Sequence, residues 1–239
     1  MKTMTTLASQ SSIFETMQLA SGYHQKGDFA NAEKLYQQVL QKDPRHADAN
    51  QFLGMIAHKF GFHKVAAQLV TNSIAVDPNQ PQRYFILGNI FENLLEIDKA
   101  AQCYQKAISL KADFIEAHNN LGLIYKNNHD YPSAVVCFKN VINGNPNSAI
   151  AWANLGNIYK ESGLLPDAIE ALENAVRLDP NFSSAYSNLL LALNYSSDVT
   201  PDYLFEKHQY WEQYCANTTL RNRFSFKGRA AKEGRIAKL

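Results

Sequence analysis

The chain has 239 residues, of which 46% are hydrophobic and 19% charged, and its formal net charge is +1. This composition supplies a packed core and excludes both a disordered chain and a protein that is basic throughout. The charge is uneven, because residues 221–239 carry seven Lys or Arg and only Glu233, whereas residues 1–220 carry 16 Lys or Arg and 21 Asp or Glu. We therefore expect any attraction to an acidic partner to belong to the tail and not to the body.

The first segment, residues 1–12, has one Lys and no continuous apolar run, so it is not a secretory signal and is expected to be a flexible N-terminus. No stretch approaches the roughly 18 apolar residues that span a bilayer. Three cysteines, Cys103, Cys137 and Cys215, are too few and too widely spaced for a disulfide framework or a zinc site. These features predict a cytoplasmic protein without a membrane partner.

From residue 13 onward the sequence repeats with a period of 34 residues, as the phrase Asn-Leu-Gly at 120–122 and again at 154–156 shows. Small residues recur at the eighth position of each unit, large apolar residues at the twenty-fourth, and proline near the end of all units but the third. The twentieth positions are Ala32, Ala66, Ala100, Ala134 and Ala168. Five units follow: 13–46, 47–80, 81–114, 115–148 and 149–182.

Each unit has the pattern of two helices joined by a turn. Small residues at the eighth and twentieth positions allow the two helices to approach closely. Gly27 and Gly61 fall between the helical stretches as turn residues, and Asp-Pro at 43–44 ends a second helix because the residue before proline avoids the α region. A helix pair cannot bury its apolar face alone, so we expect consecutive pairs to stack.

The repeats fade in residues 183–219, which form a partial sixth unit and a capping helix. Leu190 replaces the small residue, and Asp202 stands at the alanine position. Thr200 and Pro201 are typical of a helix start. The helix is expected to cover the last repeat, and its charges lack the basic face of a membrane-surface helix. The helix is expected to pass through the aromatic residues Tyr203, Phe205, Trp211 and Tyr214.

The columns match the pattern W-x₂-L-G-x₂-Y…A-x₃-F…P, and residues 13–182 resemble the tetratricopeptide repeat family. The fifth unit fits best, with Trp152, Leu155, Gly156, Tyr159, Ala168, Leu172 and Pro180. The resemblance implies an all-α fold, a right-handed α-solenoid of stacked antiparallel helix pairs with a C-terminal capping helix. The first helix of every unit then lines a concave groove.

The sixth position of each first helix is expected to face this groove. Three successive sixth positions are Asn120, Asn154 and Asn188, and Asn89 and Asn157 lie at ninth positions one turn further along. An asparagine amide donates and accepts hydrogen bonds, so such a ladder suits the backbone of an extended peptide. The alternative is that these amides are solvated or satisfy a neighbouring turn.

The N-terminal half of the groove has an apolar character instead. Its residues are Phe14, Met17, Phe52, Met55, Phe85 and Ile86. They are expected either to form an apolar binding patch or to be covered, by residues 1–12 or by a second copy of the chain in a homodimer.

Other candidate sites are weak. His24 and His58 share the twelfth position of adjacent units and could face each other, but no third ligand has matching spacing, so no metal is expected. No nucleotide-binding or catalytic motif is present, which predicts a non-enzymatic chain without a cofactor. Capture of a C-terminal carboxylate is also not expected, because the fifth positions hold no cation. They are Met17, Gln51, Phe85, Asn119 and Ala153.

Residues 117–122 and 151–156 also resemble the repeats of the O-linked N-acetylglucosaminyltransferase family, and residues 187–195 resemble the joint before the glycosyltransferase region of bacterial relatives. This resemblance implies a substrate-recruiting region whose partner is a missing C-terminal catalytic domain, with residues 220–239 as a truncated linker. The alternative is a stand-alone assembly adaptor. Nucleic acid, or another acidic surface bound by the basic tail, is disfavoured because no nucleic-acid fold is present.

Overall fold

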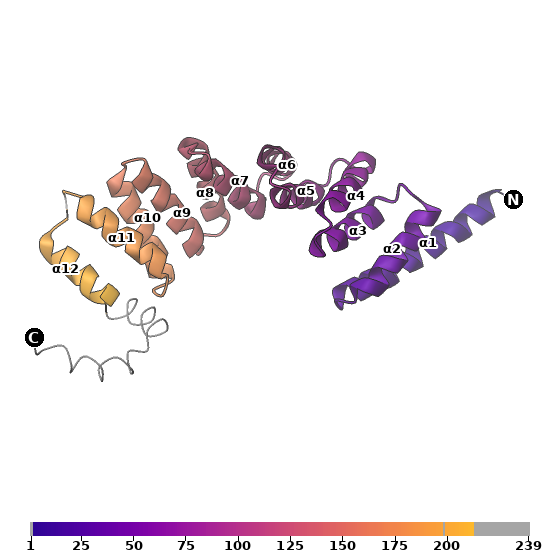
Figure 1. The fold of residues 1–239 in the computed structure, drawn as a ribbon, viewed down its shortest axis with the longest axis horizontal. Helices are drawn as coiled ribbons and strands as arrows, with labels where there is room; N and C mark the ends of the chain where they lie inside the picture. The colour runs from indigo at the N-terminus through magenta and orange to yellow at the C-terminus, as the bar shows by residue number, and fades with distance from the viewer. Residues whose placement is uncertain (1, 198, 213–239) are drawn as a thin grey trace, which may run out of the picture. The chain divides into compact units, whose positions relative to one another are not determined.

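The computed structural model describes residues 2–197 and 199–212, with side chains from residue 12 onward. Within these residues every regular element is a helix, and consecutive helices form pairs joined by short turns (Figure 1). The helices are α1 (Lys2–Gln25), α2 (Phe29–Lys42), α3 (Ala47–Lys59), α4 (His63–Val76), α5 (Pro81–Asn93), α6 (Ile97–Leu110), α7 (Ile115–Asn127), α8 (Tyr131–Gly144), α9 (Ala149–Glu161), α10 (Leu165–Leu178), α11 (Ser183–Tyr195) and α12 (Pro201–Tyr210).

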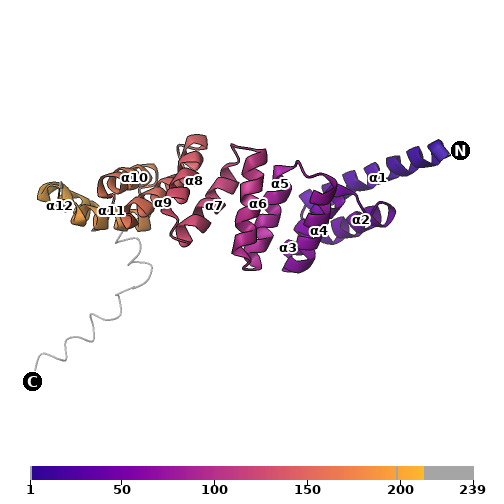
Figure 2. The ribbon, with the colours of Figure 1, turned by 90° about the horizontal axis from the view of Figure 1, so that it is seen from above.

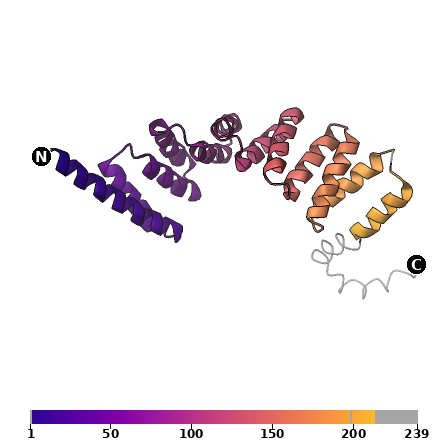
Figure 3. The same ribbon diagram turned by 180° about the vertical axis from the view of Figure 1, so that it is seen from behind.

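The chain forms two compact units, Met1–Ile124 and Tyr125–Leu239, and the division falls within α7. In the first unit α1 packs on α2, α3 on α4 and α5 on α6, while α2–α3 and α4–α5 contacts join successive pairs (Figure 2). In the second unit α9 contacts α8 and α10, and α10 also contacts α11, as seen from behind in Figure 3. Each unit thus shows the stacking of helix pairs that the sequence period predicts.

Small side chains bring the two helices of a pair together. All five alanines at the twentieth positions are fully buried, with 0% of each exposed, which confirms the prediction. At Gly88 an added Cβ would lie 2.5 Å from Tyr104 Cε1, so α5 approaches α6 more closely than alanine would allow. Gly156 has the same relation to Leu172, whose Cγ would lie 2.6 Å from the added atom.

The turn inside each pair has one shared geometry. Its fifteenth residue is left-handed, with φ of 77°, 83° and 77° at Gly27, Gly61 and Gly163, and of 60° and 59° at Leu95 and His129. One backbone hydrogen bond of 2.9 Å then closes every turn, from the sixteenth N–H to the eleventh carbonyl. The donor and acceptor pairs are Asp28–Tyr23, Phe62–Ala57, Glu96–Phe91, Asp130–Tyr125 and Leu164–Tyr159. A turn set by the whole helix pair therefore accepts Leu and His where glycine is easiest.

The helix at the N-terminal end of the described chain begins earlier than the sequence predicts, whereas the helix at the C-terminal end begins at the predicted residue. α1 begins at Lys2, so it includes residues 2–12, which the sequence predicts to be flexible. α12 begins as predicted, with Thr200 Oγ1 accepting a hydrogen bond from the Tyr203 amide and Pro201 in the first turn.

The capping helix packs with some of its aromatic residues and not with others. Tyr203 and Leu204 pack on the core that holds Leu189, whereas Phe205 is 64% exposed. Trp211, just after α12, packs against Tyr186 and its neighbours. Tyr214, Cys215 and the tail at 220–239 lie outside the described residues.

None of the helices in residues 2–197 and 199–212 has both the length and the apolar character that a membrane span requires.

Candidate peptide-binding surface

The side chains at the sixth positions of α1, α3 and α5 are not equivalent. Gln18 is exposed, whereas Phe52 stacks on Tyr36 with a ring-centroid distance of 5.6 Å and meets the His24 ring edge-on at 5.8 Å. Ile86 is only 7% exposed and belongs to the core around α4 and α5. Two of these three side chains therefore pack their apolar surface against other residues of the chain.

The predicted apolar patch is reduced accordingly. Phe85 packs against Phe114 and Tyr104, and Met55 packs against the same core as Ile86. Phe14, 63% exposed, is the patch member that offers most of its side chain to solvent. It borders a hollow of about 510 Å³ together with Ile13 and Met17.

Asn120, the first predicted rung, is satisfied by its neighbours in the first unit. Its Nδ2 donates to Asn89 Oδ1 at 3.1 Å and to Tyr104 Oη at 3.2 Å, and its Oδ1 accepts from Asn119 Nδ2 at 3.3 Å. The hydroxyl oxygen of the fully buried Tyr104 lies 2.6 Å from Asn89 Oδ1 and 2.5 Å from Glu92 Oε2, so its single proton can be donated to either of them. Burial first, and then the Glu92 carboxylate, raises the pKa of Tyr104.

Asn154 and Asn188, in the second unit, have a different partner. Lys126 Nζ donates to Asn154 Oδ1 at 3.3 Å, and Lys160 Nζ donates to Asn188 Oδ1 at 2.7 Å. In each case a lysine at the twelfth position of one repeat reaches the sixth position of the next repeat. We call these two contacts the lysine–asparagine pairs. All four side chains are half-buried.

The pairs leave a defined set of free hydrogen-bonding groups. An amide oxygen that accepts from an ammonium still leaves two amide N–H donors, and the ammonium keeps two further N–H groups. The second unit therefore offers donors at two places one repeat apart. This arrangement can bind the carbonyl or carboxylate oxygens of another chain, and it has no catalytic chemistry of its own.

Asn157, at a ninth position, differs from both groups. Its Oδ1 is buried and has no hydrogen-bond partner among the described residues. Asn89, at the corresponding position in the first unit, accepts from both Asn120 and Tyr104. The two predicted ninth-position asparagines thus have opposite environments.

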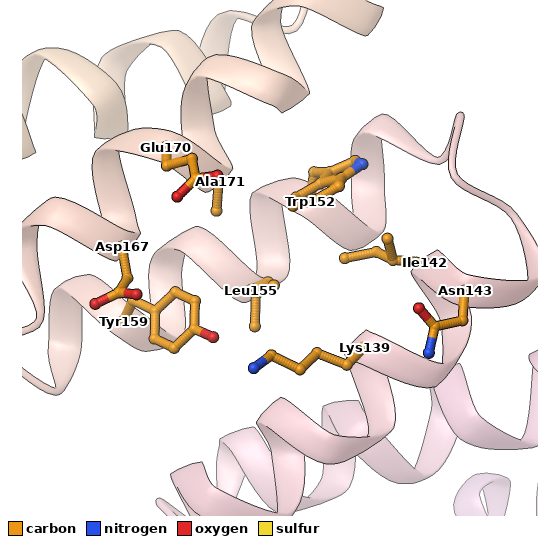
Figure 4. Close-up of a pocket in the computed structure, with 9 residues that line it drawn as sticks. All are labelled: Lys139, Ile142, Asn143, Trp152, Leu155, Tyr159, Asp167, Glu170 and Ala171. Carbon is orange, nitrogen blue, oxygen red and sulfur yellow. The ribbon is translucent and has the colours of Figure 1, made fainter.

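The opposite face of α9 forms a separate hollow of about 370 Å³ (Figure 4). Trp152, Leu155 and Tyr159 lie three and four residues apart and so share one side of the helix. The helical period places Asn154 and Asn157 on the other side. Lys139 of α8 and two carboxylates of α10 complete the hollow. This surface is therefore not part of the predicted ladder.

The two candidate histidines contact other rings, and the two described cysteines are free thiols. His24 packs against Phe29, Tyr36 and Phe52, so it does not pair with His58, whose Nδ1 lies 3.0 Å from His63 Nδ1. No cluster of three or more metal-ligating side chains occurs in the described residues. Burial raises the pKa of Cys103 and of Cys137 to about 11, so both thiols stay protonated at neutral pH.

The two lysines were missed by the sequence analysis, which looked for cations at the fifth positions of the first helices. The cations that contact the asparagines are at the twelfth positions. The sequence indicated them, because Lys126 and Lys160 are separated by one 34-residue period. The basic tail, to which the sequence assigns any attraction to an acidic partner, lies outside the described residues.

Three segments match repeat-family models: residues 17–81 and 149–182 match models described as tetratricopeptide repeat, and residues 96–128 one described as TPR repeat. Together they make up more than half of the chain. None of the curated proteins matches it.

Solved structures with the same fold include PilF of Pseudomonas aeruginosa, which is 16% identical with a TM-score of 0.71, over 91% of this chain and 94% of that one. YrrB, described as a TPR protein with an unusual peptide-binding site, is 21% identical with a TM-score of 0.66, over 75% and 96%. MamA is 24% identical with a TM-score of 0.63, over 69% and 96%. These likenesses establish the fold.

Proposed function

The chain is a tetratricopeptide-repeat protein, and we propose that it is a non-catalytic scaffold that holds extended protein segments on the face formed by its first helices. The observation that carries this proposal is the repetition of the lysine–asparagine pairs at Asn154 and Asn188. Free amide donors at a fixed interval can hold a peptide backbone through its carbonyl groups while reading little of its side-chain sequence. The peptide-binding site of YrrB, a protein of the same fold, supports the proposal.

The expected affinity is modest. Two rungs with one or two hydrogen bonds each, at about 1 kcal/mol net apiece, must also offset the ordering of the peptide. An isolated segment is then expected to bind with a dissociation constant on the order of 10 µM to 1 mM.

The test is the double substitution of Asn154→Ala and Asn188→Ala. Capture of a library of unfolded, terminally blocked peptides on the immobilised protein should fall by about thirtyfold, because about 1 kcal/mol is lost at each of the two rungs. Thermal unfolding should change little, because both amides are half-buried and face solvent on one side. Asn174→Ala in α10 is the matched control, since this asparagine bonds to Glu170 and Arg177 of its own helix. Unchanged capture by the double variant would remove these asparagines from the proposal.

A narrower proposal is that the scaffold recruits substrates for a protein O-glycosyltransferase of the O-linked N-acetylglucosaminyltransferase type. It is supported by the resemblance of residues 117–122, 151–156 and 187–195 to that family. The test expresses the complete reading frame that encodes the chain and measures sugar transfer to a captured protein. Transfer that falls in the Asn154→Ala, Asn188→Ala variant supports recruitment, whereas absence of transfer favours a stand-alone assembly adaptor.

A further inference from the structure

We propose that the second unit selects extended segments with internal acidic side chains, whose carboxylates contact the lysine–asparagine pairs. This inference rests on the proposed function, because it names the chemistry of the segment that the scaffold holds. It is carried by the hydrogen bonds and the charge of Lys126 and Lys160.

The first argument is the direction of the hydrogen bonds. Because Asn154 Oδ1 and Asn188 Oδ1 already accept from lysine ammonium groups, each pair has donors left and its amide oxygen engaged. Each Asn Oδ1 keeps one lone pair, but the remaining N–H groups of a pair outnumber it, so this position favours a ligand that brings acceptors. A carboxylate is the strongest acceptor in a protein chain, and its hydrogen bonds to an ammonium are charge-assisted.

The second argument is uncompensated charge. In the part of the chain that the structure describes, neither Lys126 nor Lys160 forms an ion pair with a carboxylate. The nearest sequence neighbour of Lys160, Glu161, is instead hydrogen-bonded to Tyr131, whose pKa it raises. Both lysines are half-buried as residues, and their stems therefore hold the ammonium groups close to the asparagines without a carboxylate from the described residues beside them.

The third argument is the surrounding charge. Residues 125–212 carry ten Asp or Glu and five Lys or Arg, so most of this unit repels an acidic segment. The pairs are local exceptions in this field. An acidic segment is thus disfavoured elsewhere on the unit and is favoured where the two lysines contact it.

The repetition of the pairs points to internal carboxylates. A C-terminal carboxylate occupies one place, whereas side-chain carboxylates along a segment can contact both pairs at once, and the second contact then becomes intramolecular. Because α9 carries Asn154 of one pair and Lys160 of the other, a single helix connects the two contacts.

The test compares two fluorescent, terminally blocked peptides, one of alternating glutamate and serine and the other of alternating glutamine and serine. Fluorescence anisotropy should show that the full chain binds the glutamate peptide about tenfold more tightly. The Lys126→Gln, Lys160→Gln variant should lose this preference and retain its affinity for the glutamine peptide. Lys126→Arg, Lys160→Arg should keep the preference, and Lys139→Gln, which removes a cation from the other face, should leave both affinities unchanged.

The outcomes separate the two proposals. If both peptides bind the wild-type chain equally and the Asn154→Ala, Asn188→Ala variant weakens both, the scaffold stands and the acidic preference is overturned. If neither peptide binds, both proposals fail. A preference that survives the glutamine substitutions, that requires a free C-terminus, or that single-stranded RNA matches with the same lysine dependence also overturns the inference.

Discussion

At the scale of single residues, the same amino acid has a different role according to its neighbours. Asn89 and Asn157 occupy the ninth position of their repeats, yet Asn89 accepts two hydrogen bonds and Asn157 Oδ1 has no partner among the described residues. A buried acceptor without a partner costs about 1–3 kcal/mol, whereas one with partners contributes to stability.

This difference makes a prediction from matched substitutions. Asn157→Leu should raise the free energy of unfolding by about 1 kcal/mol, because it removes the unpaired oxygen. Leu123 and Leu191 already stand at the ninth position of the neighbouring repeats. Asn89→Leu should lower that free energy by about 1–3 kcal/mol, because the Asn120 amide loses an acceptor and the Tyr104 hydroxyl keeps only Glu92. Denaturant unfolding measures both, and a loss of stability in Asn157→Leu would contradict the assignment.

The residue scale also shows how far the sequence predicts the site. The 34-residue period placed Asn120, Asn154 and Asn188 at equivalent positions, but it could not tell that they would differ. The difference comes from the preceding repeat, where Asn89 and Tyr104 bond to Asn120, whereas a lysine at the twelfth position bonds to each of the other two. Such contacts join residues 28 apart and depend on side-chain conformations that no column reveals.

At the scale of elements, the distance between paired helices is set by the smallest residue between them. Gly88 leaves no space for a methyl group against Tyr104, whereas nothing lies within 4 Å of a Cβ added at Gly22 in α1. The repeat columns predicted the first of these contacts because small and large residues alternate at fixed positions.

Two glycine substitutions therefore have opposite expected effects. Gly88→Ala should destabilise the chain by about 1–3 kcal/mol, because Tyr104 must move and its hydroxyl leaves Asn89 and Glu92. Gly22→Ala should stabilise by about 0.5–1 kcal/mol, because alanine favours a helix interior. Thermal unfolding compares the two variants, and equal melting temperatures would show that α5 and α6 can separate without loss.

The helices themselves were largely predictable, and their exceptions have physical causes. The ends of α2, α4 and α10 fall before Asp-Pro as expected. Leu95 and His129 occupy left-handed turn positions that sequence alone would reserve for glycine, because the hydrogen bond that closes the turn fixes the backbone there. The start of α1 at Lys2 was not predicted, since residues 2–12 lack the repeat columns on which the analysis depended.

At the scale of the whole molecule, the response to acid is expected to come from the first unit. Burial first, and then Lys59, lowers the pKa of His24, and burial together with His63 lowers that of His58. Both residues lie in Met1–Ile124. A lowered pKa means that the folded state favours the neutral imidazole ring. Each histidine therefore makes its full contribution to stability above its unfolded-state pKa of about 6.5, and this contribution is lost as the pH falls below that value.

The expected result is a free energy of unfolding that declines as the pH falls below about 6.5. The His24→Gln, His58→Gln variant should show a shallower decline, whatever its stability at neutral pH, because two proton-binding groups have been removed. Denaturant unfolding at several pH values measures the slope, with the exposed His129→Gln as control. An unchanged slope in the double variant would assign the acid response to other groups.

The lysine–asparagine pairs also have an evolutionary consequence. Each pair needs two consecutive repeats, and residues 149–182 contain both Asn154 and Lys160. Tandem duplication of that stretch would bring its own donor and acceptor, so the copied lysine would meet the next asparagine without any further mutation. Duplication of one repeat can therefore extend the ligand-binding surface by one lysine–asparagine pair, and deletion of a repeat can remove one pair.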